Sequence, residues 1–150
     1  MAATTNGPLG RLITVPLREV WSNEARDFTP WLADKPNIEL LSETLQLGEL
    51  TIQGIERPVG NFYIDILARD ESDGIVIIEN QLESTNHIHL GQILTYLGGQ
   101  EGKATIIWIA ERFRDEHRAA IDWLNGDTKD DFNFFGVELE VLRIGSGAPI

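Results

Sequence analysis

Cysteine is absent from this chain of 150 residues, which excludes disulfide bonds and thiolate metal sites. Long hydrophobic runs are absent too, since no apolar segment approaches the roughly 20 residues that a helix needs to cross a bilayer. The first ten residues lack the basic start and apolar stretch of a secretory signal peptide. These absences predict a soluble protein of the reducing cytoplasm that has no membrane partner.

Basic residues are scarce. Twelve Lys and Arg stand against 24 Asp and Glu, which gives a formal net charge of −12. The densest basic cluster, Arg112, Arg114 and Arg118, is interrupted by Asp115 and Glu116. Because phosphate contacts supply most of the affinity of a nucleic-acid binder, we expect this chain alone to bind nucleic acid weakly. The charge is compatible with a cation site, or with a partner that supplies a basic surface.

The composition is otherwise that of a globular protein, with 42% hydrophobic and 24% charged residues, and the length suits one domain with a proper core. We predict a poorly ordered leader over residues 1–12, a domain over 13–144 and a tail over 145–150. The tail has linker composition. It is either a frayed end or the start of a linker to a second domain, and a homodimer is the other assembly to consider.

Alternation of apolar and polar residues is the clearest local pattern. It predicts a strand over 61–69, with Asp65 on the face opposite Ile64 and Ile66. A polar turn over 70–74 leads to a β-branched strand over 75–82. Other strands are predicted over 49–55, 104–110 and 134–144, whereas 40–47 is compatible with a helix or a strand.

Helices are predicted after Ser22, from about residue 84 to Leu97, and over 114–124. Ser22 is the expected N-cap of the first helix, and Thr29 is the expected cap of a new start at Pro30. The residues expected on the buried sides of the three helices are Ala25, Phe28, Trp31 and Leu32, then Leu90, Ile93, Leu94 and Leu97, then Ala119, Ala120, Trp123 and Leu124. All four tryptophans are expected in the core.

Polar side chains gather at the end of the strand over 75–82. A period of two puts Glu79 and Gln81 on the same face as Ile75 and Ile77. The preceding strand, joined by a short turn, carries Asp65 on an otherwise apolar face. An acid in such a strand is costly to bury unless something compensates its charge. A divalent cation held between Asp65 and Glu79 would do so.

These residues resemble the motif of the PD-(D/E)xK nucleases, the restriction-endonuclease-like superfamily. Its pattern is an acid on one strand, a short turn and then (D/E)-x-K on the next strand, which Asp65 and Glu79-Asn80-Gln81 match at a separation of 79 − 65 = 14 residues. Gln92 and Tyr96 resemble the Q-x-x-x-Y signature of the RecB-like branch. Glu24 is the best-placed counterpart of an acid that this family often carries on its first helix.

The resemblance covers roughly residues 22–144 and implies a three-layer α/β fold, with an αβββαβ core and a central mixed β-sheet flanked by helices. It implies hydrolysis of phosphodiester bonds in DNA, with RNA as the alternative substrate and Mg²⁺ or Mn²⁺ as cofactor, in a bacterial setting. Asp65, Glu79 and the backbone carbonyl of Asn80 are the implied metal ligands. Gln81 would orient the attacking water, Glu24 would be a second ligand or base, and Gln92 and Tyr96 would brace the site or touch the phosphate.

Gln81 stands where the family usually has lysine, and it carries no charge and does not titrate. Together with the net charge of −12, this favours a second hypothesis, an inactive module of the same fold that acts in protein interaction or assembly. Each residue also has a structural explanation. In these explanations Asp65 would pair with an arginine, Glu79 and Gln81 would be polar strand ends, and Glu24 would be exposed. Gln92 and Tyr96 would form a surface pair, and His87 and His89 would be solvated and point apart.

Overall fold

The computed structural model describes residues 8–128 and 130–150. Its centre is a five-stranded mixed sheet in the order β2-β3-β4-β5-β6. β2, β3 and β4 are antiparallel to their neighbours in this group, whereas β4, β5 and β6 run parallel. The bounds of the strands are β2 (Thr51–Val59), β3 (Phe62–Arg69), β4 (Ile75–Ser84), β5 (Ala104–Arg112) and β6 (Phe132–Glu138).

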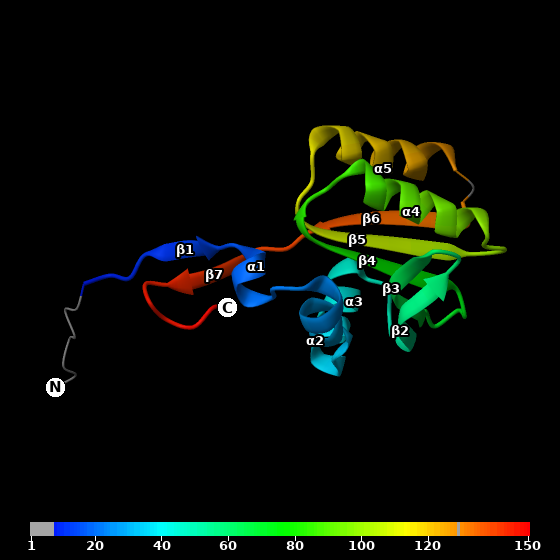
Figure 1. Cartoon of the computed structure of the whole chain (residues 1–150). Helices are drawn as coiled ribbons and strands as arrows, with labels where there is room; N and C mark the ends of the chain where they lie inside the picture. Colours follow the sequence, from blue (N-terminus) through cyan, green and yellow to red (C-terminus); the bar gives the residue numbers. More distant parts are fainter. Residues whose placement is uncertain (1–7, 129) are drawn as a thin grey trace.

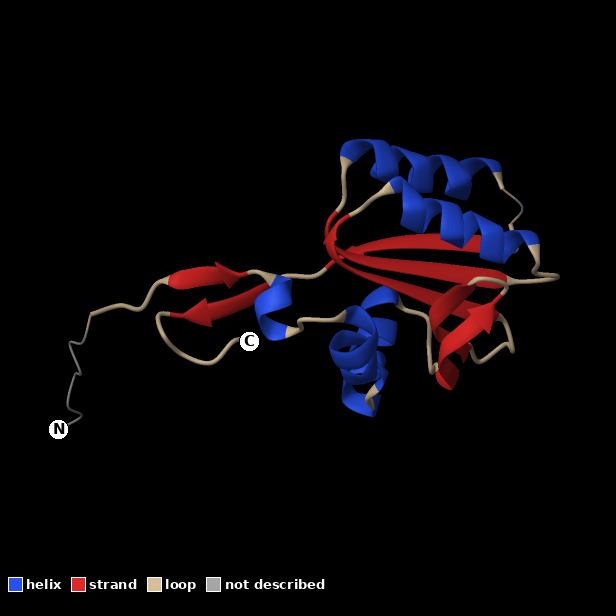
Figure 2. Ribbon diagram, viewed as in Figure 1, coloured by secondary structure: helices blue, strands red, loops and turns tan. Residues whose placement is uncertain are grey.

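Helices cover both faces of this sheet (Figures 1 and 2). On one face lie α4 (His87–Gly98) and α5 (Asp115–Asp127). On the other lie a π-helical turn η1 (Glu24–Phe28), α2 (Thr29–Ala33) and α3 (Lys35–Leu45). Within residues 8–128 and 130–150, no helix combines the length and the hydropathy that a bilayer-spanning helix requires.

A second, two-stranded sheet forms a ribbon that projects from the body (Figure 1). It pairs β1 (Leu12–Val15) with β7 (Val141–Ile144) in antiparallel register, Leu12 opposite Ile144. The short helix α1 (Leu17–Val20) follows β1, and the backbone N–H of its first residue donates to Glu111 at the end of β5. Residues 145–150 fold back, since Ile150 and Leu142 exchange two backbone hydrogen bonds.

Each face of the sheet has its own hydrophobic core, because β4 and β5 are buried on both sides. Ile66, Ala68, Val76 and Ile78 face α2 and α3. Ile77, Ile106 and Trp108 face α4 and α5 together with Ile93 and Tyr96 from α4. The parity of a residue on β4 therefore decides which layer it faces.

The expected α/β class is confirmed, with helices on both faces of a central mixed sheet. The order from α3 to β5 is helix, three strands, helix, strand, as the αβββαβ pattern requires. The strands predicted over 61–69, 75–82 and 104–110 are present within two residues of their predicted bounds, and the helix predicted to end at Leu97 is present from His87 to Gly98. The ambiguous segment 40–47 lies mostly in the helix α3.

The single last strand predicted over 134–144 was wrong. β6 ends at Glu138, the N–H of Leu139 donates to the carbonyl of Ala110, and β7 then joins the ribbon with β1. The alternation of apolar and polar residues continues across this boundary, with Glu138 and Glu140 both exposed. The pattern therefore carries no sign that the chain passes from one sheet to another.

Details at the helix starts also differ. The side chain of Asn23, not Ser22, caps η1 by accepting the N–H of Arg26, while the Ser22 hydroxyl donates to Asp27. Thr29 is the first residue of α2 rather than its cap, and Pro30 is its second. Both residues fit because the first turn of a helix needs no internal N–H donor.

The buried sides of the helices are rotated from the predicted ones. α5 buries His117, Ile121 and Leu124 and runs on to Asp127, so Asn125-Gly126 does not end it. α4 buries Ile93 and Tyr96, while Leu94 is 44% exposed. Trp21 and Trp108 are in the core as predicted, but Trp31 and Trp123 are 38% and 63% exposed. Ala25 and Ala119 are exposed as well.

Candidate metal centre

β4 presents Glu79 and Gln81 toward the layer of α4 and α5. Both have the parity of Ile77, which lies in the core beneath these helices. Their exposed fractions are only 2% and 1%, so two polar side chains are buried near the end of an apolar strand. Asn80, of opposite parity, points to the other layer, where its side-chain amide donates to the hydroxyl of Thr29 at 3.0 Å.

Asp65 lies where β3 and β4 separate. The paired register of the two strands ends at Ile66 opposite Ile78, so Asp65 and Glu79 are the first residues beyond it on their strands. Instead of a ladder partner from β3, the N–H of Asn80 donates to Oδ2 of Asp65 at 2.7 Å. The two carboxylates predicted from the alternation therefore belong to one local cluster.

Burial opposes ionisation of both acids. It raises the pKa of Asp65 to about 7, and the charges of Glu56 and Glu24 act in the same direction, whereas the hydrogen bond from Asn80 opposes them. Burial raises the pKa of Glu79 to about 9, and the charges of Asp65 and Glu56 add to the effect. A cation between the carboxylates would reverse this balance, because it favours their charged forms.

Free acceptor atoms also mark this cluster. Oε2 of Glu79 and Oε1 of Gln81 are buried and have no hydrogen-bond partner in the protein. Nε2 of Gln81 donates to the carbonyl of Ser84 at 2.8 Å, and a carbonyl only accepts, so the amide end of the side chain is fixed. The remaining end of Gln81 is therefore an acceptor, suited to a water proton or a cation.

Glu24, the predicted acid of the first helix, has partners already. Its two carboxylate oxygens accept from the guanidinium of Arg18 at 2.7 and 3.3 Å, and Oε1 also accepts the N–H of Leu82 at 3.2 Å. Glu24 thus contacts the end of β4 at Leu82, the second residue after Asn80. In this geometry it connects η1 to β4.

The predicted pair on α4 divides into two different environments. Tyr96 is 1% exposed, and its hydroxyl donates to the backbone carbonyl of Tyr63 at 2.7 Å, two residues before Asp65. Burial raises the pKa of Tyr96, and the charges of Glu79 and Asp65 raise it further. Gln92 is half-buried on the same helix. The surface-pair explanation is therefore wrong for Tyr96, which fixes α4 against β3.

His89 was expected to be solvated and is instead half-buried beside Glu79, with its Nε2 3.9 Å from Oε1 of that residue. The side-chain oxygen of Asn86 accepts both the backbone N–H and Nδ1 of His89, which leaves the Nε2 lone pair facing the acid. Burial lowers the pKa of His89, so both partners favour their neutral forms. The N-capping residue Asn86 three positions before His89 is the sequence signal for this arrangement.

His87 points elsewhere, which confirms that the two histidines diverge. Its Nδ1 lies 2.7 Å from Nε2 of His117, and Nδ1 of His117 lies 2.6 Å from the Thr85 hydroxyl. His117 is 1% exposed and was not singled out from the sequence. This chain of polar contacts joins the starts of α4 and α5.

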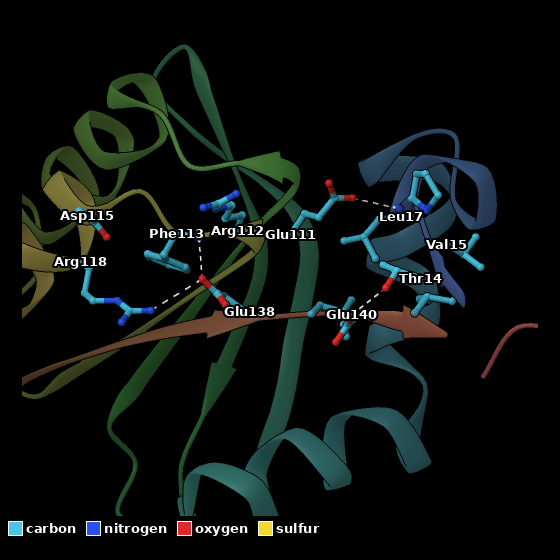
Figure 3. Close-up of a pocket in the computed structure, with 13 residues that line it drawn as sticks. Thr14, Val15, Leu17, Glu111, Arg112, Phe113, Asp115, Arg118, Glu138 and Glu140 are labelled. Carbon is cyan, nitrogen blue, oxygen red and sulfur yellow. Dashed lines mark hydrogen bonds and ion pairs between the residues drawn. The ribbon is translucent and has the colours of Figure 1, made fainter. Parts of the chain in front are cut away.

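A groove of about 820 Å³ lies at the junction of the ribbon and the body, and Figure 3 shows the residues that line it. None of the predicted site residues is among them. Three of its acids have partners: Glu111 accepts from Leu17, Glu140 from Thr14, and Glu138 from the N–H of Phe113. These partnered carboxylates fix the junction, whereas the unpartnered carboxylate oxygen of Glu79 lies elsewhere, in the cluster with Asp65.

The donor set fits a hard cation such as Mg²⁺, which takes one or two carboxylates and keeps several waters. In residues 8–128 and 130–150, no three Asp, Glu or His side chains converge closely enough to form a ready three-ligand site. A cation here would therefore contact the side chains of Asp65 and Glu79 and take its other ligands from water and the backbone.

Comparison with known proteins finds no matching family model and no matching curated protein. Two solved structures are similar to this chain at 17% identity over 67% of its length. They are the EndoMS–dsDNA2 complex, with a TM-score of 0.47, and a repair endonuclease from Pyrococcus abyssi, with a TM-score of 0.48. The similar region spans 42% and 45% of those chains, less than half of each.

Proposed function

We propose that this chain is a Mg²⁺-dependent nuclease domain that hydrolyses phosphodiester bonds in DNA, with RNA as the other substrate class and Mn²⁺ as an alternative cation. The observation that supports the proposal is the hydrogen bond from the N–H of Asn80 to Oδ2 of Asp65 at 2.7 Å, which holds Asp65 close to Glu79 on the neighbouring strand. Glu79 is 2% exposed and keeps an unpartnered oxygen, which a cation would satisfy.

Asp65 and Glu79 would hold the cation, and the backbone carbonyl of Asn80 is the third ligand that we assign. When bound, a divalent cation neutralises charge on the scissile phosphate and makes a nearby water more acidic. The free Oε1 of Gln81 accepts a hydrogen bond from that water and so orients it toward phosphorus. Asp65 itself is held in place by the N–H of Asn80.

The other predicted residues act through position. Tyr96 fixes the backbone two residues before Asp65, and Glu24 holds η1 to the end of β4 through Leu82. Gln92, one turn before Tyr96 on α4, is the residue that we assign to contact with the phosphate. His89 keeps its Nε2 toward Glu79 and limits the directions in which that carboxyl group can turn.

The second candidate is a catalytically inactive module that acts in protein interaction or assembly. Gln81 favours it, because no charged side chain stands where the lysine of the family pattern would be. The net charge of −12 favours it too, because it repels a phosphate backbone.

Plasmid cleavage separates the two candidates. With Mn²⁺ or Mg²⁺ present, the parent chain is expected to nick supercoiled DNA. Asp65→Asn and Glu79→Gln are expected to lower the rate by more than about 100-fold, beyond the usual cost of losing an outer-shell partner. Glu43→Gln, an equal change of charge at an exposed site on α3, serves as the control and should cleave like the parent.

Two results would contradict the nuclease proposal. Equal cleavage by Asp65→Asn and the parent would trace the activity to a contaminating enzyme. Absence of cleavage together with absence of any rise in melting temperature on addition of Mn²⁺ would leave the inactive module as the function, because a ligand that binds only the folded state must stabilise it.

A further inference from the structure

An extra residue in β2 changes which face its later side chains occupy. Ile52 pairs with Ala68, but the next pair is Gly54 with Leu67, so Gln53 has no partner of its own across β3. Such a bulge shifts the register by one residue. Because side chains alternate with a period of two, a shift of one moves every later side chain to the opposite face.

The shifted register brings Glu56 to the candidate metal centre. Ile55 pairs with Ile66 and Arg57 with Ile64, which leaves Glu56 opposite Asp65. Asp65 in turn accepts the N–H of Asn80, the residue that follows Glu79 on β4. Three acids from three neighbouring strands therefore form one row across the sheet. Without the bulge, Glu56 would lie opposite Ile64 and face away from Asp65.

The backbone at Glu56 is held in a conformation that glutamate seldom adopts. Its φ is +51°, in the left-handed region, which costs roughly 1–2 kcal/mol for a residue with a side chain. Gly54, two residues earlier, is not in that region. Strain at a non-glycine residue is retained where surrounding structure imposes it, and such residues cluster at ligand sites.

One carboxylate oxygen of Glu56 is an unused hydrogen-bond acceptor. Its Oε1 is buried and has no hydrogen-bond partner in the protein. The charge of Glu56 raises the pKa of Asp65, of Glu79 and of Tyr96, as expected of an acid that lies near all three. The buried Glu79 contributes a second unpartnered oxygen to the same row.

Glu24 and Glu56 are the two acids available as a third partner for the strand pair, and their environments differ. Both oxygens of Glu24 accept from Arg18. Glu56 makes no hydrogen bond through Oε1 and no ion pair within the described residues. A cation gains more from an acid that has no competing partner.

We infer that Glu56 is the third acid of the cation site and that it holds the cation through a bound water. This inference rests on the proposed function above, since it takes Asp65 and Glu79 as the direct ligands. The water link follows from the lack of a ready three-ligand group in the described ranges and from the reluctance of Mg²⁺ to lose its waters. Glu56 is thus a positioning residue that accepts a hydrogen bond from that water through Oε1.

Isothermal titration of MnCl₂ into the full chain and its variants tests the inference. Removal of an outer-shell partner typically weakens metal binding 10–100-fold, so Glu56→Gln is expected to raise the Kd for Mn²⁺ by about 10-fold or more. Asp65→Asn is expected to abolish binding. Glu43→Gln removes the same charge from an exposed position and is expected to stay within about twofold of the parent.

A second variant, Glu56→Gly, covers the case in which Glu56→Gln does not fold. Glycine adopts positive φ without cost, so this variant is expected to melt at a higher temperature than the parent without metal. It is also expected to bind Mn²⁺ about 10-fold or more weakly. A merely structural role for Glu56 would not raise stability while lowering metal affinity.

The outcomes separate the two claims. If the parent binds Mn²⁺ and both Glu56 variants bind it like Glu43→Gln, the role of Glu56 is overturned and the nuclease proposal stands. If the parent binds no Mn²⁺, both are overturned. Weak binding in the Glu56 variants with tight binding in the control supports the inference.

Discussion

Asp65 and Glu79 destabilise the fold that holds them. Each loses hydration on burial and feels the charge of Glu56, and Glu79 also feels the charge of Asp65. A natural protein keeps such groups where they serve a ligand or a reaction, because a structural acid would have acquired a partner. At this scale the candidate site is a local cost in stability that a cation would remove.

The raised pKa values predict how stability depends on pH. In the unfolded chain these acids release their protons near pH 4, whereas in the folded chain Asp65 keeps its proton to about pH 7 and Glu79 to about pH 9. The folded state binds more protons between these limits, so stability is highest at the acid end and falls as pH rises from about 4 to 9. Without divalent cations, we expect the free energy of unfolding to fall across this window, by up to about 1.4 kcal/mol per pH unit for each acid that is ionised only in the unfolded chain.

Urea unfolding in EDTA at several pH values measures this. Asp65→Asn keeps an acceptor for the N–H of Asn80 and is expected to flatten the dependence and to exceed the parent in stability at pH 9. Asp122→Asn, on the exposed side of α5, is the control and should follow the parent. A parent chain whose stability rises steadily from pH 5 to 9 would show that the acids are compensated by the protein itself.

Among the elements, α4 has the closest bearing on the site, because Tyr96 joins it to β3. Pro58, the partner of Tyr63 across β2 and β3, has no N–H to donate, and the Tyr96 hydroxyl supplies a donor to the Tyr63 carbonyl. Tyr96→Phe is expected to lower the free energy of unfolding by about 1 kcal/mol, the usual net value of such a hydrogen bond. Chemical denaturation followed by circular dichroism gives this value.

The only other tyrosine supplies a matched control, since Tyr63 is 58% exposed. Tyr63→Phe also removes a tyrosine hydroxyl, but it keeps the backbone carbonyl of residue 63 that accepts from Tyr96. Its stability is expected to equal that of the parent within a few tenths of a kcal/mol, as for other surface changes. If both variants lose the same amount, the hydroxyl of Tyr96 does not fix α4 to β3.

The elements best predicted from sequence are those whose periodicity reflects a single environment. The alternation of Ile66 and Leu67, which pack in different cores, agrees with the prediction, and the parity of β4 placed Glu79 and Gln81 together. Ile64 differs, because it packs in the core of Ile77 and not in that of Ile66. Helix faces were harder, because the polar residues His117 and Tyr96 are buried with satisfied hydrogen bonds. A pattern based only on apolar residues therefore predicts a buried face of α4 and of α5 that is rotated about the helix axis from the observed one.

Glu56 and His89 could not be found by periodicity. Glu56 depends on a one-residue bulge and a left-handed backbone, and neither leaves a mark on the alternation of β2. Helical spacing relates His89 only to residues of its own helix, such as His87, whereas the acid that it contacts, Glu79, lies on another element. Both residues depend on how separate elements pair and pack, and the periodicity of a single strand or helix carries no information about that.

At the scale of the whole molecule, the charge of −12 predicts an unusual response of DNA binding to salt. Basic proteins lose affinity when cations compete for phosphate. Here Mg²⁺ is expected to strengthen binding of a short duplex at least about threefold at constant ionic strength, since it reduces the repulsion between acids and phosphates. Fluorescence anisotropy of a labelled duplex, with Mg²⁺ exchanged against Na⁺, measures the effect.

Asp65→Asn is the informative comparison here as well. If the cation acts at the candidate site, this variant is expected to lose the Mg²⁺-dependent gain, whereas Glu43→Gln keeps it. A parent chain that binds more weakly as Mg²⁺ replaces Na⁺ would mean that its DNA affinity comes from basic residues after all.

The ribbon of β1 and β7 has a consequence for how the chain is made. Val15 pairs with Val141, so 126 residues separate the two strands along the sequence. At roughly 5–20 residues per second, a ribosome needs on the order of ten seconds to produce them. Throughout that interval β1 has no strand to pair with, and closing so long a loop is slow even afterwards. The ribbon is therefore the last part of the molecule to form, when the layers around the sheet have already assembled.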